Sequence, residues 1–461
     1  MFFLTETIFI MLSLKCIKNP LIVMMITSLV VLITSGLYSV SVHNNIRIFL
    51  SFAFSVYLFY RIFFKKNIVT ISLNSIVLLS FVFIGLLQLQ LSNNFISYDE
   101  KILHAFILIT YLSLLLIFIL SLSNNQQEEC KNIQIKSVVL LQIILFISLL
   151  SVFLLNDSFK ESIDMFFENI RILNNIQAVT IPFLFLVLLQ RNIVYKTLAF
   201  ILLSINIFIL IESTSRAVIL SLLLSYFIIY LNNKDRIKSI DREALVSVFL
   251  IFTISVMAFL IMHLYLDDLN SKENHILESL HHTSGRLDMW KEELKVLFLD
   301  TNIFQAIGFA SESKFTFPNA HPHNIVLFFM NGLSVFFGLF FISHISYKLF
   351  LFLRKTRNAF DINSEYFHIS ASVLTFFFVS LFSGIYFNQI AIFVLMISIS
   401  ILQENLYQNV NTTYLIKLNK TISMFFLAIV AIANFMLLEK SSELLLNKDN
   451  EKTPTFGIYI K

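Results

Sequence analysis

The chain is long, strongly hydrophobic and poor in charge. Of its 461 residues, 57% are hydrophobic and 13% are charged, the mean hydropathy is +0.82 and the formal net charge is +4. Because a soluble protein carries roughly 25% charged residues, this composition excludes a water-soluble globular protein, and we expect no nucleic-acid partner. The two cysteines, Cys16 and Cys130, are too few for a disulfide framework.

Apolar runs of about 18 or more residues recur along the chain, which is the pattern of transmembrane helices. The candidate spans are 21–40, 46–64, 70–91, 102–122, 137–155, 178–189, 197–211, 217–231, 244–266, 325–345, 367–387, 390–402 and 422–438. The short span at 178–189 contains Pro182, so we expect it to extend upstream or to be kinked. The sequence therefore predicts an all-α, polytopic membrane protein of about 12 to 13 transmembrane helices.

Basic residues divide the connections between these spans into two sets. The basic set contains Lys15, Lys18, Arg61, Lys65, Lys66, Lys131, Lys136, Arg191, Lys196, Lys234, Arg236, Lys238, Arg242, Lys348, Arg354, Lys355, Arg357, Lys417 and Lys420. The short connections on the opposite side contain only Arg47, Lys101, Lys160, Arg171 and Arg216. By the positive-inside rule the basic set is cytoplasmic, so the long polar segment 267–324 lies on the outer side.

The spans and the loops divide the chain into four parts. Residues 1–266 form an N-terminal bundle of about nine transmembrane helices, and within it 158–173 has apolar residues at helical spacing, which predicts an amphipathic helix on the outer leaflet. Residues 267–324 form one large outer loop. Residues 325–438 contain the C-terminal transmembrane helices, and 439–461 form a polar tail.

The outer loop contains an amphipathic helical pattern with an arginine at its start. The apolar positions, at steps of three and four, are Leu287, Trp290, Leu294, Leu297 and Phe298. They predict a helix from about Arg286 to Leu299, with Thr283 or Ser284 as N-cap. Arg286 then lies where backbone N–H groups favour an anion and adds donors suited to phosphate; a surface ion pair is the simpler interpretation.

A second arginine, Arg216, is predicted at the outer end of a span, in the sequence Glu212-Ser213-Thr214-Ser215-Arg216-Ala217. Charges at this depth are costly and usually face a cavity or a partner. The charge at this depth would also be explained if the Arg216 side chain reaches out to the lipid surface or forms an ion pair with Glu212. Two arginines on the same side suit a diphosphate better than either does alone.

Histidines are concentrated in the outer loop, which holds His275, His281, His282, His321 and His323 of the ten in the chain. In Ala320-His321-Pro322-His323-Asn324, a histidine can take a proton from a sugar hydroxyl near neutral pH, and Asn324 can orient the ring or the substrate. A structural hydrogen bond is the simpler role for a single histidine. No HExxH spacing is present, so we expect no metal and no cofactor.

Asn388 and Gln389 fall in a predicted tight outer turn between the spans 367–387 and 390–402. They either line a cavity shared with the loop or satisfy the backbone of the turn. The polar residues His104 and Asn206 fall within spans, where interhelical hydrogen bonds are the expected role.

The order of these residues resembles a known family. A Ser-Arg-small sequence at the outer end of a span (Arg216), an arginine in a large outer loop (Arg286), His323-Asn324 before the next span, and then Gly332 and Gly338 are similar to the O-antigen ligase and polymerase superfamily of bacterial envelope glycosyltransferases. The resemblance covers residues 213–338. Two departures are the sequence Gly308-Phe309-Ala310, where such loops often carry Gly-x-Gly, and an extra span at 422–438.

The resemblance implies a GT-C-like fold in the bacterial inner membrane, with the active site on the periplasmic side. It implies metal-independent, inverting transfer of a glycan from undecaprenyl diphosphate without a cofactor. Arg216 and Arg286 would bind the diphosphate, and His323 would activate the acceptor hydroxyl with Asn324 beside it. His321 is a second candidate for the base.

Three functions remain open, and the number of large outer loops helps to separate them. We favour an O-antigen ligase that uses a lipid A–core acceptor, because only one outer loop is large and the segment 156–175 is short. A repeat-unit polymerase uses the same donor but often has two large loops. A lipid-linked oligosaccharide flippase belongs to a different class, for which we would expect pseudo-symmetric halves that the sequence does not show.

Overall fold

A computed structural model describes residues 70–71, 80, 128–153, 170–189, 192–213, 215–236, 249–257, 286–300, 302–306, 324–361, 364–407 and 416–417. Several predictions lie outside these residues: the spans before residue 128, apart from 70–71 and Ser80, the amphipathic residues 158–169, the caps Thr283 and Ser284, both candidate bases His321 and His323, and the tail 439–461.

The regular secondary structure of the described residues is helical apart from one very short strand pair, in which β1 (Thr70–Ile71) lies antiparallel to β2 (Ile416–Lys417). The longer helices are α6 (Glu128–Phe153), α8 (Ile170–Leu188), α9 (Ile193–Glu212), α10 (Arg216–Asn233), α15 (Val335–Lys355), α16 (Glu365–Ser380) and α17 (Gln389–Tyr407). The shorter elements are α13 (Arg286–Lys295), the π-helix η1 (Val296–Asp300), α14 (Ile325–Leu333) and the 3-10 helix η3 (Ile385–Phe387).

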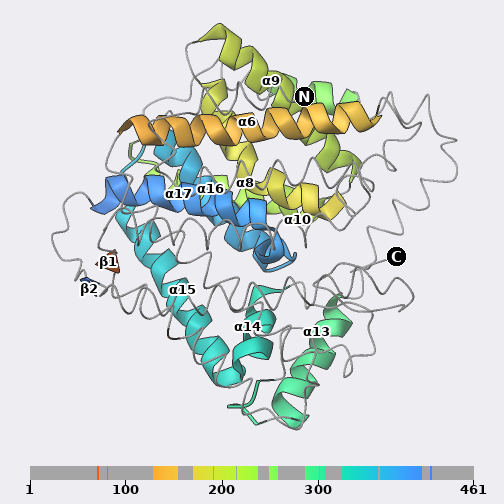
Figure 1. Ribbon diagram of the computed structural model, residues 1–461, viewed down its shortest axis with the longest axis vertical. Helices are drawn as coiled ribbons and strands as arrows, with labels where there is room; N and C mark the ends of the chain where they lie inside the picture. The colour runs from red at the N-terminus through yellow and green to blue at the C-terminus, as the bar shows by residue number, and fades with distance from the viewer. Residues whose placement is uncertain are drawn as a thin grey trace, which may run out of the picture.

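Four helices in the described part of the chain, α8, α9, α10 and α15, are long and apolar enough to cross a membrane. This confirms the predicted helical class for the described residues and gives four helices that could span a membrane. The helices α6, α8, α16 and α17 lie together in one bundle, and α13, α14 and the start of α15 lie to one side of it (Figure 1).

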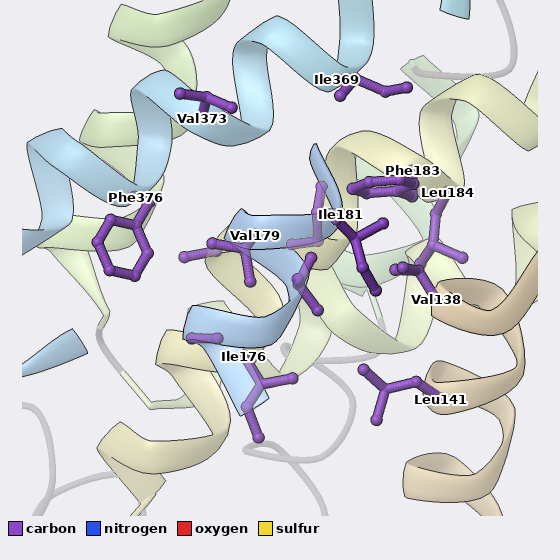
Figure 2. Packing of buried hydrophobic residues seen from close by; sticks show 14 of the residues in the cluster. Val138, Leu141, Ile176, Val179, Ile181, Phe183, Leu184, Ile369, Val373 and Phe376 are labelled. Atoms are coloured by element: carbon purple, nitrogen blue, oxygen red, sulfur yellow. The ribbon is translucent and has the colours of Figure 1, made fainter. Parts of the chain in front are cut away.

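Helix α8 lies at the centre of the bundle and is buried on nearly every side. Figure 2 shows its residues Ile176, Val179 and Phe183 among apolar side chains of α6 and α16, all in one continuous core. The helix begins at Ile170, well before the expected span at 178–189, and continues through Pro182. The structure thus confirms that the short apolar run extends upstream.

Hydrogen bonds explain how polar residues fit inside this bundle. Gln142 of α6 donates to the hydroxyl of Thr180 on α8 and accepts a 3.0 Å hydrogen bond from the Nδ2 of Asn206 on α9. Asn206 also donates to the Leu202 carbonyl at 2.7 Å. The interhelical role expected of Asn206 is therefore confirmed, and these bonds tie α6, α8 and α9 together.

The predicted continuous span at 325–345 is wrong, because the chain breaks there into α14 and α15. Ser334 joins the two helices with a φ of 77° and a ψ of 164°. Apolar residues continue through the break, so hydropathy gives no sign of it. Of the two helices, only α15 is long enough to span a membrane. It turns back and packs on α14. The contact is made at Gly338 in the first turn of α15, where the Gly338 N–H donates to the Ser334 carbonyl.

The basic ends of α10 and α15 meet at one end of the molecule. Asn233 Oδ1 accepts from the backbone N–H groups of Ala359 and Phe360, both at 3.0 Å, and Arg236 Nε donates to the Asn358 carbonyl at 2.9 Å. The predicted topology requires these two ends to lie on the same side, and the structure brings them together.

Replacing Gly338 with alanine is expected to force α14 and α15 apart. A Cβ at this position would lie 2.5 Å from the Phe329 carbonyl oxygen and 2.6 Å from the Met330 Cα, both backbone atoms of a packed helix. We expect a loss of about 1–3 kcal/mol in unfolding free energy, seen as a lower melting temperature in detergent. Ser343→Ala, at an exposed position of the same helix, is the control, and an unchanged Gly338→Ala protein would contradict the close packing.

Candidate functional site

Helix ends that are far apart in the sequence meet at the end of the bundle that the charge pattern assigns to the outer side. The starts of α8, α10, α14 and α17 lie here, with the ends of α9 and α16. Hydrogen bonds from side chains to neighbouring helices, rather than apolar contacts alone, hold them in place. Asparagine side chains provide most of these bonds, because a carboxamide both donates and accepts.

Three hydrogen bonds run in sequence across this end. Ser213, at the end of α9, donates to the Oδ1 of Asn174 at 3.2 Å, and Ser383, just after α16, donates to the Oδ1 of the neighbouring Asn175 at 3.1 Å. Asn324 then donates from Nδ2 to the Leu381 carbonyl at 3.1 Å. These bonds connect the turn before Arg216 to the start of α14 by way of α8.

Arg216 is the first residue of α10 and its side chain is exposed. It follows Ser213 by three residues, so the bond between Ser213 and Asn174 fixes the turn that carries it. Its position at a helix N-terminus combines a guanidinium with the positive end of the helix dipole. The arrangement suits an anion that approaches from outside the bundle.

Asn324 caps the N-terminus of α14. Its Oδ1 accepts from the N–H groups of Val326 at 2.8 Å and Leu327 at 3.2 Å, while Nδ2 bonds the end of α16. The amide is thus oriented by backbone groups and fixes where the chain enters α14. The residue directly before it is His323, which like His321 lies outside the described residues. Asn324 therefore fixes the first residue of α14 against the end of α16.

Asn388 hydrogen-bonds backbone groups, which is the simpler of the two roles considered for it. The side chain is buried, its Nδ2 donates to the Ile172 carbonyl at 2.9 Å, and its Oδ1 accepts from the N–H of Ala391 at 3.1 Å. Both polar atoms thus satisfy backbone groups, which joins the start of α17 to the start of α8. Gln389 is the first residue of α17.

The predicted loop helix is present as α13, with its last turn widened into the π-helix η1. It packs on α14 through a small cluster formed by Leu297, Leu327, Met330 and Val335. The N–H of Phe336, just after α14, bonds the Ile303 carbonyl, just after η1, at 3.0 Å. The two helices therefore run in the same direction side by side (Figure 1), and Arg286 and Asn324 lie at corresponding ends of the pair.

The buried face of α13 differs from the predicted one. Leu294 and Phe298 are 39% and 52% exposed, whereas Met289 and Glu293 are each 3% exposed. Trp290 and Leu297, which were predicted to share an apolar face, both pack in the cluster with α14. Sequence analysis missed Glu293 because a charged residue is normally assigned to the solvent side, although it lies one turn from Leu297 on the same stripe.

Burial changes the acid–base behaviour of Glu293. Desolvation raises the pKa of this carboxyl from 4.5 to about 8. Within the described ranges, no group of histidine, cysteine, aspartate and glutamate side chains has the arrangement of a metal site. The buried carboxyl of Glu293 is thus an ionisable group of this region in addition to Arg216 and Arg286.

Neither a protein-family model, nor a curated protein, nor a solved structure matches this chain.

The two bonding modes of Asn324 can be separated by substitution. Asn324→Ala removes both the cap and the bond to Leu381 and is expected to cost about 1–2 kcal/mol, whereas Asn324→Ser keeps a capping oxygen and is expected to cost less. Asn192→Ala is the matched control, because Asn192 caps α9 with a single bond to Val194 and is exposed. Thermal unfolding that ranks Asn192→Ala as more damaging than Asn324→Ala would contradict this account.

Proposed function

We propose that the chain is a bacterial inner-membrane glycosyltransferase that takes a glycan from undecaprenyl diphosphate on the periplasmic side. We further propose that it is an O-antigen ligase, with lipid A–core as acceptor, and has a GT-C-like fold of about 12 to 13 transmembrane helices. The observation that carries the proposal is the row of hydrogen bonds from Ser213 through Asn174 and Asn175 to Asn324. It links the chain segments that bear Arg216 and His323.

The arginine positions support binding of a diphosphate. Arg216 begins α10 and Arg286 begins α13, so each stands at a helix N-terminus where N–H groups already favour negative charge. Arg286 also lies at the same end of the α13–α14 pair as Asn324. In the proposed reaction both guanidinium groups stabilise the charge that develops on the leaving diphosphate.

The proposed chemistry is a direct displacement at the anomeric carbon of the donor glycan. The His323 imidazole accepts the proton of the acceptor hydroxyl while the hydroxyl oxygen bonds to that carbon. The bond from the carbon to the diphosphate oxygen breaks, and the diphosphate leaves with the electron pair. Asn324, held by three backbone groups, fixes the residue that acts as base, and no metal or cofactor takes part.

The first test uses a bacterial strain that lacks the gene. Its lipopolysaccharide is separated on a gel and its undecaprenyl-linked glycan is sized. Rough lipopolysaccharide with long chains still on the carrier is the expected result for a ligase. Single repeats would instead identify a polymerase, and an unchanged glycan on the outer side would contradict glycosyl transfer and favour the flippase.

Substitution of the arginine tests the diphosphate role. Arg286→Lys keeps the charge but loses the planar set of donors, so we expect transfer to fall roughly 100-fold or more in a complementation or reconstituted assay. Lys295→Ala, which removes a cation from the other end of α13, is the control and is expected to stay active. Full activity of Arg286→Lys would exclude this role.

Substitution of the histidines identifies the base. We expect His323→Ala to reduce transfer by roughly 100- to 10,000-fold while the protein still inserts into the membrane at the normal level. His321→Ala is the matched comparison two residues away. Loss confined to His321→Ala would transfer the role to that residue, and activity in both single variants would exclude a histidine base here.

A further inference from the structure

The contact between α13 and α14 contains two buried oxygen atoms that lack a hydrogen-bond donor among the described residues. They are the Oε2 of Glu293 on α13 and the Oδ1 of Asn331 on α14. Each residue is only 3% exposed. A buried acceptor without a donor is costly, and a buried carboxylate without a counter-charge is more so.

Both residues belong to the same helix–helix contact. Glu293 precedes Leu297 by one turn, and Leu297 packs on Leu327 and Met330 of α14. Asn331 directly follows Met330 and is one turn after Leu327. The two unsatisfied oxygens therefore lie on the stripes through which α13 and α14 meet.

Among the described residues, the elements next to the α13–α14 contact offer no cation to neutralise Glu293. Helix α14, residues 302–306 and the first turn of α15 contain no charged or titratable side chain, and the charged residue of η1 is Asp300. On α13 itself, Lys291, Glu292 and Lys295 are exposed and so lie away from the contact. A proton on Glu293 would remove the charge and at the same time create a donor.

We propose that Glu293 is a positioning residue, which in its protonated form donates a hydrogen bond to the Oδ1 of Asn331 and so holds α13 against α14. One proton then satisfies both buried oxygens. The effect on catalysis rests on the proposed function, because α13 begins with Arg286 and α14 follows the candidate base. Release of α13 would separate the diphosphate site from the base.

The raised pKa of Glu293 agrees with this role and determines how the docking of α13 on α14 changes with pH. Burial raises this pKa from 4.5 to about 8. Between pH 4.5 and pH 8, Glu293 is therefore protonated when α13 is packed on α14 (docked) and ionised when α13 is released (undocked). By linkage, docking is strongest below pH 4.5, weakens as the pH rises to about 8, and changes no further once both states are ionised.

The chain carries its own probe for this equilibrium, because Trp290 is its only tryptophan and packs in the α13–α14 cluster. We would titrate the tryptophan emission and acrylamide quenching of the full-length protein in detergent from pH 5 to 9.5. The expected result is a red shift and stronger quenching with rising pH, in a single reversible step that ends near pH 8.

Two variants and a control make the assignment specific. Glu293→Gln keeps a hydrogen-bond donor at every pH, so the pH-dependent step in tryptophan emission is expected to disappear in this variant. Glu292→Gln changes an exposed neighbour and is expected to keep the wild-type step. Asn331→Asp places a second carboxyl in the contact, and two carboxyls that share a proton should raise the midpoint by about one pH unit or more. A flat wild-type titration, or a midpoint that Asn331→Asp leaves unchanged, would overturn the proposal.

Activity separates this proposal from the proposed function. If the protein is a transferase, wild-type activity should fall more steeply than that of Glu293→Gln as the pH rises towards about 8. A tryptophan step without any transferase activity would leave the Glu293 contact standing and reject the enzyme. Transfer that proceeds without a tryptophan step would reject the contact alone.

Discussion

Buried carboxamides on α8 set the constraint on which the rest of the structure depends. Asn174, Asn175 and Gln177 lie in the first turns of a helix that is buried on nearly all sides. In an interior without water, such groups must find partners on other helices. Asn174 and Asn175 find theirs at the ends of α9 and α16, so the requirement for hydrogen bonds decides which helix ends meet.

The same constraint produces the candidate site. A serine–asparagine bond between two helices adds a directional contact to apolar packing and so helps to fix their position and register. The bonds to Asn174 and Asn175 fix the turn before Arg216 and the end of α16, and Asn324 then places α14 on that end. A binding site that depends on exact geometry is well served by fixed helix ends.

The α13–α14 pair is held in a different way. Its apolar cluster is small, formed by Leu297, Leu327, Met330 and Val335, and it includes the buried Glu293 within one turn. A contact of this size stabilises less than the main core, and the proposed protonation of Glu293 would make it depend on pH. On that proposal, pH would regulate the attachment of the helix that begins with Arg286.

The sequence by itself determined the helical membrane class, the extension of α8, the loop helix that begins at Arg286 and the interhelical role of Asn206. These follow from composition, hydropathy and spacing, which act locally along the chain. Only the tertiary structure decided that Ser334 breaks a continuous apolar run, that Asn324 and Asn388 bond backbone groups, and that Glu293 rather than Leu294 is buried. Each of these depends on which partner a residue meets across another helix, and neither hydropathy nor spacing encodes that partner.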